Sequence, residues 1–212
     1  EMLYSVFDHY YIIHLLVKCK GGRAMNFKGQ AIIPVIGEMK DVEKLALYNY
    51  EYFAILNAHI SRLKSIFQMA KQYDKRLLLD IDLIMGLKAD EYATEYICQE
   101  YKPFGIISTK PNVIMKAKQK GVQTFQRIFL LDSQSIERSS KIIERTNPDY
   151  IELLPGVVPK IIRQFSQQTN KEIIASGFIE TVEEVQQAID AGATTITTSA
   201  KELWDYYDEK QK

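Results

Sequence analysis

Short apolar runs alternate with amphipathic segments along almost the whole chain. The segments between the runs have apolar residues three and four positions apart, for example in 91–101, 135–146 and 182–190, which is the period of an α-helix. The pattern therefore predicts eight strand–helix units. The eight runs, rich in β-branched residues, cover 30–36, 52–58, 75–82, 105–110, 123–131, 150–156, 172–178 and 194–200.

Eight such units favour a compact, single-domain (β/α)8 barrel of the TIM type. Continuous apolar strands that alternate with helices indicate a parallel sheet, because each crossover must pack back onto the sheet. The alternative is an open doubly wound sheet, but the glycine-rich turn that such folds place after their first strand is missing. No linker or low-complexity segment interrupts the pattern, so we expect one barrel domain over residues 25–212.

The first 24 residues do not continue this pattern. They mix aromatic residues and histidines and predict neither a signal peptide nor a membrane-spanning helix. Lys20-Gly21-Gly22 matches a translated purine-rich ribosome-binding sequence a few codons before Met25. We therefore expect residues 1–24 to be a non-native extension from an upstream start; the alternative is a genuine extra helix.

Composition restricts the function classes. The chain has 212 residues, of which 46% are hydrophobic, so disorder is excluded. Lys plus Arg and Asp plus Glu both number 27, so no global positive field attracts nucleic acid or membrane, and any RNA contact needs a local patch. Two cysteines, Cys19 and Cys98, provide no metal or disulfide spacing. We expect a cytoplasmic protein in which Cys98 is a buried thiol.

Two turns near the C-terminus predict a phosphate site. Ser176-Gly177 and Thr197-Thr198-Ser199 end the last two runs, where (β/α)8 barrels often bind phosphate. Capping-box patterns follow at 181–184 and 199–202, so two helix N-termini are expected to open toward one rim and attract an anion. Gly177 allows close approach, and the hydroxyl groups of Ser176, Thr198 and Ser199 can donate hydrogen bonds. The alternative is a pair of ordinary strand ends with helix caps.

Other polar residues are expected at the same mouth. Asp80 and Asp82, two apart in the third run, should share one face and could bind a polyol, hold a cation or act as acid and base. A buried Glu152 needs a partner, for which Arg127 has the right charge. The alternatives are that at least one of Asp80 and Asp82 only bonds neighbouring backbone amides, and that Lys110 is a solvated loop lysine. The expected polyol-binding set is Asp82, Lys110, Arg127 and Glu152.

The chain has few groups suited to catalysis. The sixth run offers no lysine for a Schiff base, and two of the three histidines lie in the N-terminal extension, so a metal-binding set is not evident. His59 follows the second run and is expected to start a helix. We therefore expect a binding site with no catalytic residue, metal or cofactor.

Six ordered motifs from about Gly29 to Trp204 are similar to one known family. They are DIDLIMGL, GIISTK, QRIFLLDS, PDYIELLPGVVPKII, IIASGFIET and AGATTITTSAKELW. The chain resembles the glycerol-3-phosphate-responsive antiterminators, which regulate bacterial glycerol uptake operons. The resemblance implies a (β/α)8 barrel that senses sn-glycerol 3-phosphate and acts on the leader of glycerol-operon mRNA to prevent premature termination. The residues that carry over are Asp82, Gly105, Ser108, Thr109, Lys110, Arg127, Asp132, Ser133, Glu152, Pro155, Gly156, Gly177, Thr198 and Ser199.

The sequence departs from the family pattern at two positions. Asp80 stands where many relatives have a histidine, and Ser176-Gly177-Phe178 replaces a Gly-Gly-Leu segment. These departures bear on how ligand is bound at the mouth.

RNA contact requires a local basic patch. Lys116, Lys118 and Lys120, with Lys110, are candidates, and Arg62 and Lys64 are nearby in loop order; the alternative is a solvated helix face. Two other classes remain open: a barrel enzyme acting on a small triose or polyol phosphate, with Asp82 and Glu152 as acid and base, and a phosphate-binding scaffold that acts through protein partners. The expected partners are sn-glycerol 3-phosphate and the mRNA leader, with no membrane; a homo-oligomer is left open.

Overall fold

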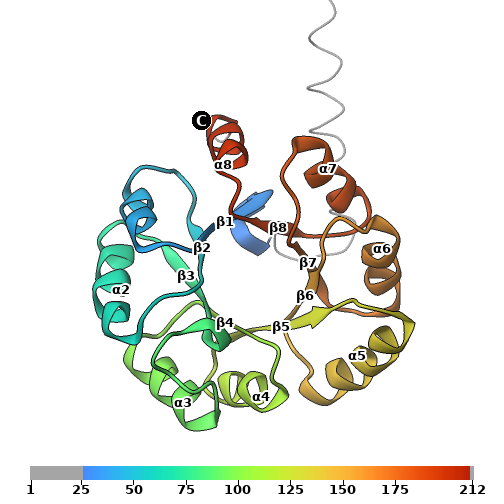
Figure 1. Cartoon of the computed structure of the whole chain (residues 1–212), viewed down its shortest axis with the longest axis horizontal. Coiled ribbons are helices and arrows are strands. Elements are labelled where there is room, and N and C mark those ends of the chain that lie inside the picture. Colours follow the sequence, from blue (N-terminus) through green and yellow to red (C-terminus); the bar gives the residue numbers. More distant parts are fainter. Residues whose placement is uncertain (1–25, 211–212) are drawn as a thin grey trace, which may run out of the picture.

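The protein is a closed barrel of eight parallel strands, and the predicted fold is confirmed. The computed structural model describes residues 26–210, so the prediction for residues 1–24 lies outside the described part. Each strand pairs with the next, and β8 pairs with β1 to close the barrel, as Figure 1 shows. The strands are β1 (Ile32–Ile36), β2 (Tyr52–Ile55), β3 (Arg76–Asp80), β4 (Gly105–Ser108), β5 (Gln123–Phe129), β6 (Tyr150–Leu154), β7 (Glu172–Ser176) and β8 (Thr195–Thr198).

Helices surround the barrel and cover the outer face of the strands (Figure 1). Between β1 and β2 the described connection is the 3-10 segment η2 (Met39–Ala46) instead of an α-helix. Shorter 3-10 segments are η1 (Asn26–Gly29), η3 (Ile60–Arg62) and η4 (Ile81–Leu83). The α-helices are α2 (Leu63–Gln72), α3 (Glu91–Glu100), α4 (Pro111–Gln119), α5 (Ser133–Thr146), α6 (Pro159–Gln168), α7 (Val182–Asp190) and α8 (Lys201–Glu209).

All eight predicted strands exist, but most end earlier than the apolar runs. The third run shows the reason. Strand β3 ends at Asp80, whose carboxylate accepts a hydrogen bond from the Asp82 N–H at 3.1 Å and starts η4. Asp82 therefore lies in a turn and not on the strand, so the prediction that Asp80 and Asp82 share one strand face is wrong.

The barrel interior is apolar at its N-terminal end. Phe27, with a left-handed φ of 58°, lies edge-on against Tyr52 with ring centroids 5.2 Å apart. Phe125 and Tyr150 stack beside it at 4.4 Å. A second apolar layer lies between the strands and the helices, and it includes the buried thiol of Cys98, whose pKa burial raises to about 11. The N-terminal end is thus packed, and polar chemistry gathers at the other end.

Within residues 26–210, none of the helices combines the length and apolar character needed to cross a bilayer.

Candidate functional site at the C-terminal mouth of the barrel

A layer of polar side chains crosses the barrel just below its C-terminal mouth. Strand side chains alternate between the two faces of a sheet, so residues two apart point the same way. Leu78, Phe125, Tyr150 and Ile174 belong to the apolar cluster inside the barrel. The residues two positions further along these strands form the next layer up. Together with one residue of β8, they are Asp80, Arg127, Glu152, Ser176 and Thr197, all buried.

Arg127 connects this layer. Its Nε donates to Glu152 Oε2 at 2.7 Å, and its Nη1 donates to Asp80. Strands β5 and β6 place Arg127 directly opposite Glu152, whereas Asp80 reaches it from β3 across the barrel interior. Nη2 has no hydrogen-bond partner among the described residues and is free to bind ligand oxygen. The predicted Arg127–Glu152 pair therefore exists, with Asp80 as a second carboxylate.

The same network continues to the phosphate-site strands. The Thr197 hydroxyl donates to Glu152 Oε1 at 3.3 Å, and it also shares a hydrogen bond with the Ser176 hydroxyl. An unbroken chain of polar contacts thus runs from Asp80 on β3 to Ser176 at the end of β7.

Burial disfavours the charged forms of both Asp80 and Arg127, but the pKa of each group is raised. Burial raises the pKa of Asp80 to about 6, although Arg127 opposes the shift; Glu152 adds to it. Burial disfavours the charge on Arg127, but Glu152 and Asp80 outweigh that cost and raise its pKa. Arg127 therefore stays cationic, while Asp80 changes protonation near pH 6.

The loop after β7 approaches the loop after β6 very closely. The Gly156 N–H donates to the carbonyl oxygens of Ser176 at 2.6 Å and Gly177 at 3.1 Å. Gly177 and Phe178 both have a left-handed backbone, with φ of 81° and 61°. Such a conformation is costly for phenylalanine, and Phe178 is 77% exposed. The hydrogen bonds from Gly156 therefore help to hold this turn in its conformation.

The two helix N-termini at this rim differ. Thr181 and Glu184 form the predicted capping box of α7. The second predicted capping box is wrong, because Ala200 is the N-cap of α8 and no side chain caps it. Ser199 is exposed, and the first turn of α8, which contains Glu202, has no side-chain cap. At α7, by contrast, the side chains of Thr181 and Glu184 accept from the amides, and Glu180 and Glu183 lie beside them.

Thr198 points away from the mouth. Its hydroxyl donates to the Ile179 carbonyl at 2.9 Å and accepts from the Ala200 N–H at 3.1 Å. It thus ties β8 to the loop after β7, and the inward hydroxyl of this strand belongs to Thr197.

Asp82 and Lys110 stabilise loops. Both oxygens of Asp82 accept hydrogen bonds at 2.7 Å, from the Ser108 hydroxyl and from the N–H and hydroxyl of Thr109. The Lys110 ammonium donates to the Ala89 carbonyl at 3.0 Å. The structure therefore gives both side chains protein partners at the rim, and Asp82 meets the Arg127 layer only through its backbone N–H, which donates to Asp80.

The three lysines predicted to bind RNA lie at the C-terminal end of α4, and each is next to a carboxylate. Lys116 lies 3.6 Å from Glu95, and Lys120 also pairs with Glu95. Lys118 lies 3.3 Å from Asp149. Helix α3 separates α4 from the helix that follows Arg62 (Figure 1). Arg62 and Lys64 do not extend this patch.

Sequence reasoning missed two members of the polar layer. Asp80 was grouped with Asp82, and Thr197 was passed over in favour of Thr198 and Ser199. The two-residue alternation of β8 carried a signal, because the apolar Ile196 packs outward, which sets Thr195 and Thr197 inward. Among the described residues no cluster of three metal-ligating side chains forms.

Comparisons with known proteins give one family. A glycerol uptake operon antiterminator regulatory protein from Listeria monocytogenes is 41% identical, with a TM-score of 0.84 over 86% of this chain and 99% of the other. A glycerol uptake operon antiterminator-related protein from Thermotoga maritima is 30% identical, with a TM-score of 0.74 over 83% and 98%. The Escherichia coli protein YgcP, described as uncharacterized, is 29% identical over 81% of this chain and 91% of its own. The family model described as glycerol-3-phosphate responsive antiterminator matches residues 32–204. The chain therefore belongs to the glycerol-3-phosphate responsive antiterminator family.

Proposed function

We propose that this protein is a cytoplasmic sensor that binds sn-glycerol 3-phosphate at the C-terminal mouth and, when loaded, binds the leader of a glycerol-operon mRNA to prevent premature termination. The observation that supports the ligand half is a helix N-terminus without a side-chain cap near the Arg127 layer. An uncapped α8 N-terminus and the Gly177 turn lie at the end of the strands whose hydroxyls join that layer.

The phosphate would bind at the rim and the glycerol hydroxyls below it. Backbone N–H groups around Gly177 and at the start of α8, with the Ser199 hydroxyl, can donate to phosphate oxygens. Arg127 Nη2 and the carboxylate of Glu152 can hold the hydroxyl groups. The ligand name in the family description agrees with this division into an anion end and a polyol end.

Several features favour sensing over turnover. None of the eight strands contains a lysine that could form a Schiff base. The carboxylates of Asp80 and Glu152 are both held by Arg127, and Asp82 is held by Ser108 and Thr109, so none is free to act as a base. A sensor benefits from such a site, since consuming the signal would erase it. The competing function is that of a barrel enzyme acting on a small triose or polyol phosphate.

Ligand must favour one of two states of the protein if it controls RNA binding. The turn at Gly177 and Phe178 is the element proposed to move, because phosphate would draw it toward the start of α8. That movement would pass to the loop after β6 through the Gly156 amide.

The test of the ligand half is calorimetric titration with sn-glycerol 3-phosphate, with glycerol and inorganic phosphate as controls, and chemical analysis of the recovered ligand. Saturable binding of unchanged ligand, tighter than either control, is expected. Converted ligand would favour the enzyme, and no binding would reject the proposed effector. A gel-shift titration of leader RNA with and without ligand then tests the RNA half.

A further inference from the structure

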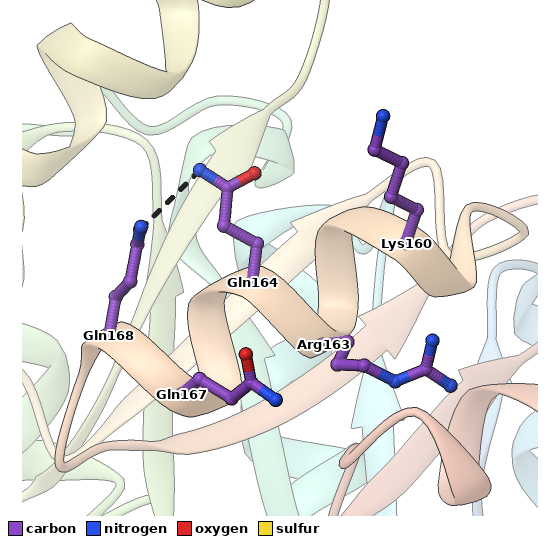
Figure 2. A pocket seen from close by; sticks show the side chains of 5 residues that line it. All are labelled: Lys160, Arg163, Gln164, Gln167 and Gln168. Carbon is purple, nitrogen blue, oxygen red and sulfur yellow. Dashed lines mark hydrogen bonds between the residues drawn. The ribbon is translucent and has the colours of Figure 1, made fainter.

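The outer face of α6 is a carboxylate-free, donor-rich surface. Lys160, Arg163, Gln164, Gln167 and Gln168 line a shallow hollow there, and Figure 2 shows their side chains extending from one helix. From Leu153 to Lys171 the chain contains no Asp or Glu. Gln164 donates to Gln168 at 3.4 Å, which is a weak contact, so these amides are available to other partners.

The two cations of this face are not neutralised. Lys160 and Arg163 are exposed and form no ion pair within the described residues. The lysines of α4 differ, because each has Glu95 or Asp149 beside it. Such surface pairs add little stability, but they cancel the field that would attract a polyanion.

The α6 face is also connected to the mouth. Helix α6 begins three residues after Gly156, whose N–H donates to the carbonyl oxygens of Ser176 and Gly177. A side chain at position 156 would come within 2.7 Å of the Ser176 nitrogen, so the two loops cannot shift independently. The start of α6 is thus tied through Gly156 to the Gly177 turn by direct hydrogen bonds.

We propose that the outer face of α6 is the surface that contacts the leader RNA, an inference that rests on the proposed function. Lys160 and Arg163 would neutralise backbone phosphates, and the three glutamines would hydrogen-bond ribose or exposed base edges of unpaired RNA. This assigns RNA recognition to the helix next to the ligand turn, whereas the α4 lysines lie elsewhere on the barrel (Figure 1).

Helix α2 provides a matched control. Lys64 and Lys71 are likewise exposed and without an ion pair in the described chain, but α2 lies on the opposite side of the barrel from α6 in Figure 1. Replacing two cations by glutamate changes the net charge equally on either helix. A difference in RNA affinity between the two variants therefore depends on where the charges lie and not on the net charge of the protein.

The experiment compares K160E/R163E with K64E/K71E in the full chain. The probe is a transcript containing the 5′ leader and terminator of a glycerol-uptake operon, titrated by fluorescence anisotropy with and without sn-glycerol 3-phosphate. We expect the α6 variant to lose at least about tenfold in RNA affinity. The slope of log affinity against log salt concentration should become shallower by about 1.4, the value for two phosphate contacts on a single strand. The α2 variant should bind like wild type.

Each outcome decides the question. Equal losses in both variants would indicate general electrostatics and overturn the assignment, as would full binding by the α6 variant while K116E/K118E/K120E fails. If wild type binds no RNA in either ligand state, the RNA half of the proposed function fails, and the α6 assignment fails with it. Calorimetric binding of sn-glycerol 3-phosphate by the variants controls for folding.

Discussion

At the scale of single residues, Arg127 determines what the mouth can do. Charge alone suggested its pairing with Glu152, because a buried carboxylate needs a cationic partner. The contact with Asp80 could not be read from the sequence, since β3 and β5 are not neighbours and the two residues meet only after the barrel closes. Burying three charged side chains in one layer costs desolvation energy.

That cost makes stability depend on pH through Asp80. Its pKa is raised from the usual 3.8 to about 6, so the folded state holds the proton more tightly. The stabilisation from this proton is complete below the unfolded pKa, and it is lost as the pH rises through about 6. The loss is up to roughly 3 kcal/mol, because one pKa unit corresponds to about 1.4 kcal/mol.

Asp80→Asn removes the titration but keeps an oxygen that can accept from the Asp82 N–H. We expect the variant to gain stability relative to wild type as the pH is raised from about 4 to about 7, because ionisation of a buried Asp80 carboxylate lowers the free energy of unfolding of wild type alone. Urea unfolding of both proteins across this range measures the difference. A constant difference would show that Asp80 does not change protonation there.

At the scale of elements, the amphipathic period of the sequence predicted α7 at its observed bounds, and the sequence before it predicted its capping box. It failed at α8, where Ser199-Ala200-Lys201-Glu202 has the letters of a capping box but Ala200 takes the N-cap position. Strand ends were also predicted too late, because the last strand residues contact neighbouring loops: the Ser176 carbonyl accepts from the Gly156 N–H, and the Thr198 hydroxyl donates to the Ile179 carbonyl. Local pattern thus predicts which elements form, while the contacts between loops fix how they end.

The contact between the loops after β6 and β7 can be tested at Gly156. A methyl group there would lie 2.7 Å from the Ser176 nitrogen and 2.8 Å from Ile179 Cδ1, so the two loops must separate. We expect Gly156→Ala to cost about 1–3 kcal/mol in urea unfolding. It should also weaken binding of sn-glycerol 3-phosphate about tenfold or more in calorimetry, because the Gly177 turn moves.

Gly37, after β1, is the matched control for this substitution. An added methyl group there would meet no atom within 4 Å. Gly37→Ala should leave both quantities nearly unchanged, within about 0.5 kcal/mol. Normal ligand affinity in Gly156→Ala would mean that the two loops are not coupled at the ligand site.

At the scale of the whole molecule, many exposed apolar side chains lie at the C-terminal ends of the strands, where the loops to the next helices begin. Five of the large exposed hydrophobic residues lie between a strand end and the next α-helix, and two more are the last residue of β5 and the first residue of η2, so these seven are placed around the mouth. The rim residues are Met39, Leu83, Met85, Phe129, Leu131, Val157 and Phe178.

If ligand draws the Gly177 turn inward, part of this rim is buried on binding, and the heat capacity must fall. Phe178 is 77% exposed, and burying a phenylalanine removes about 150–250 Å² from water. At about 0.45 cal/K/mol per Å², this contributes roughly −0.1 kcal/mol/K to the binding heat capacity.

Titration with sn-glycerol 3-phosphate at several temperatures should give a negative heat-capacity change of binding, whose magnitude Phe178→Ala reduces by about this amount. Leu47→Ala, which removes a residue 75% exposed away from the mouth, should not change it. Equal heat capacities for wild type and Phe178→Ala would mean that the turn stays open when the ligand is bound, and the signal to α6 would then have to travel by another route.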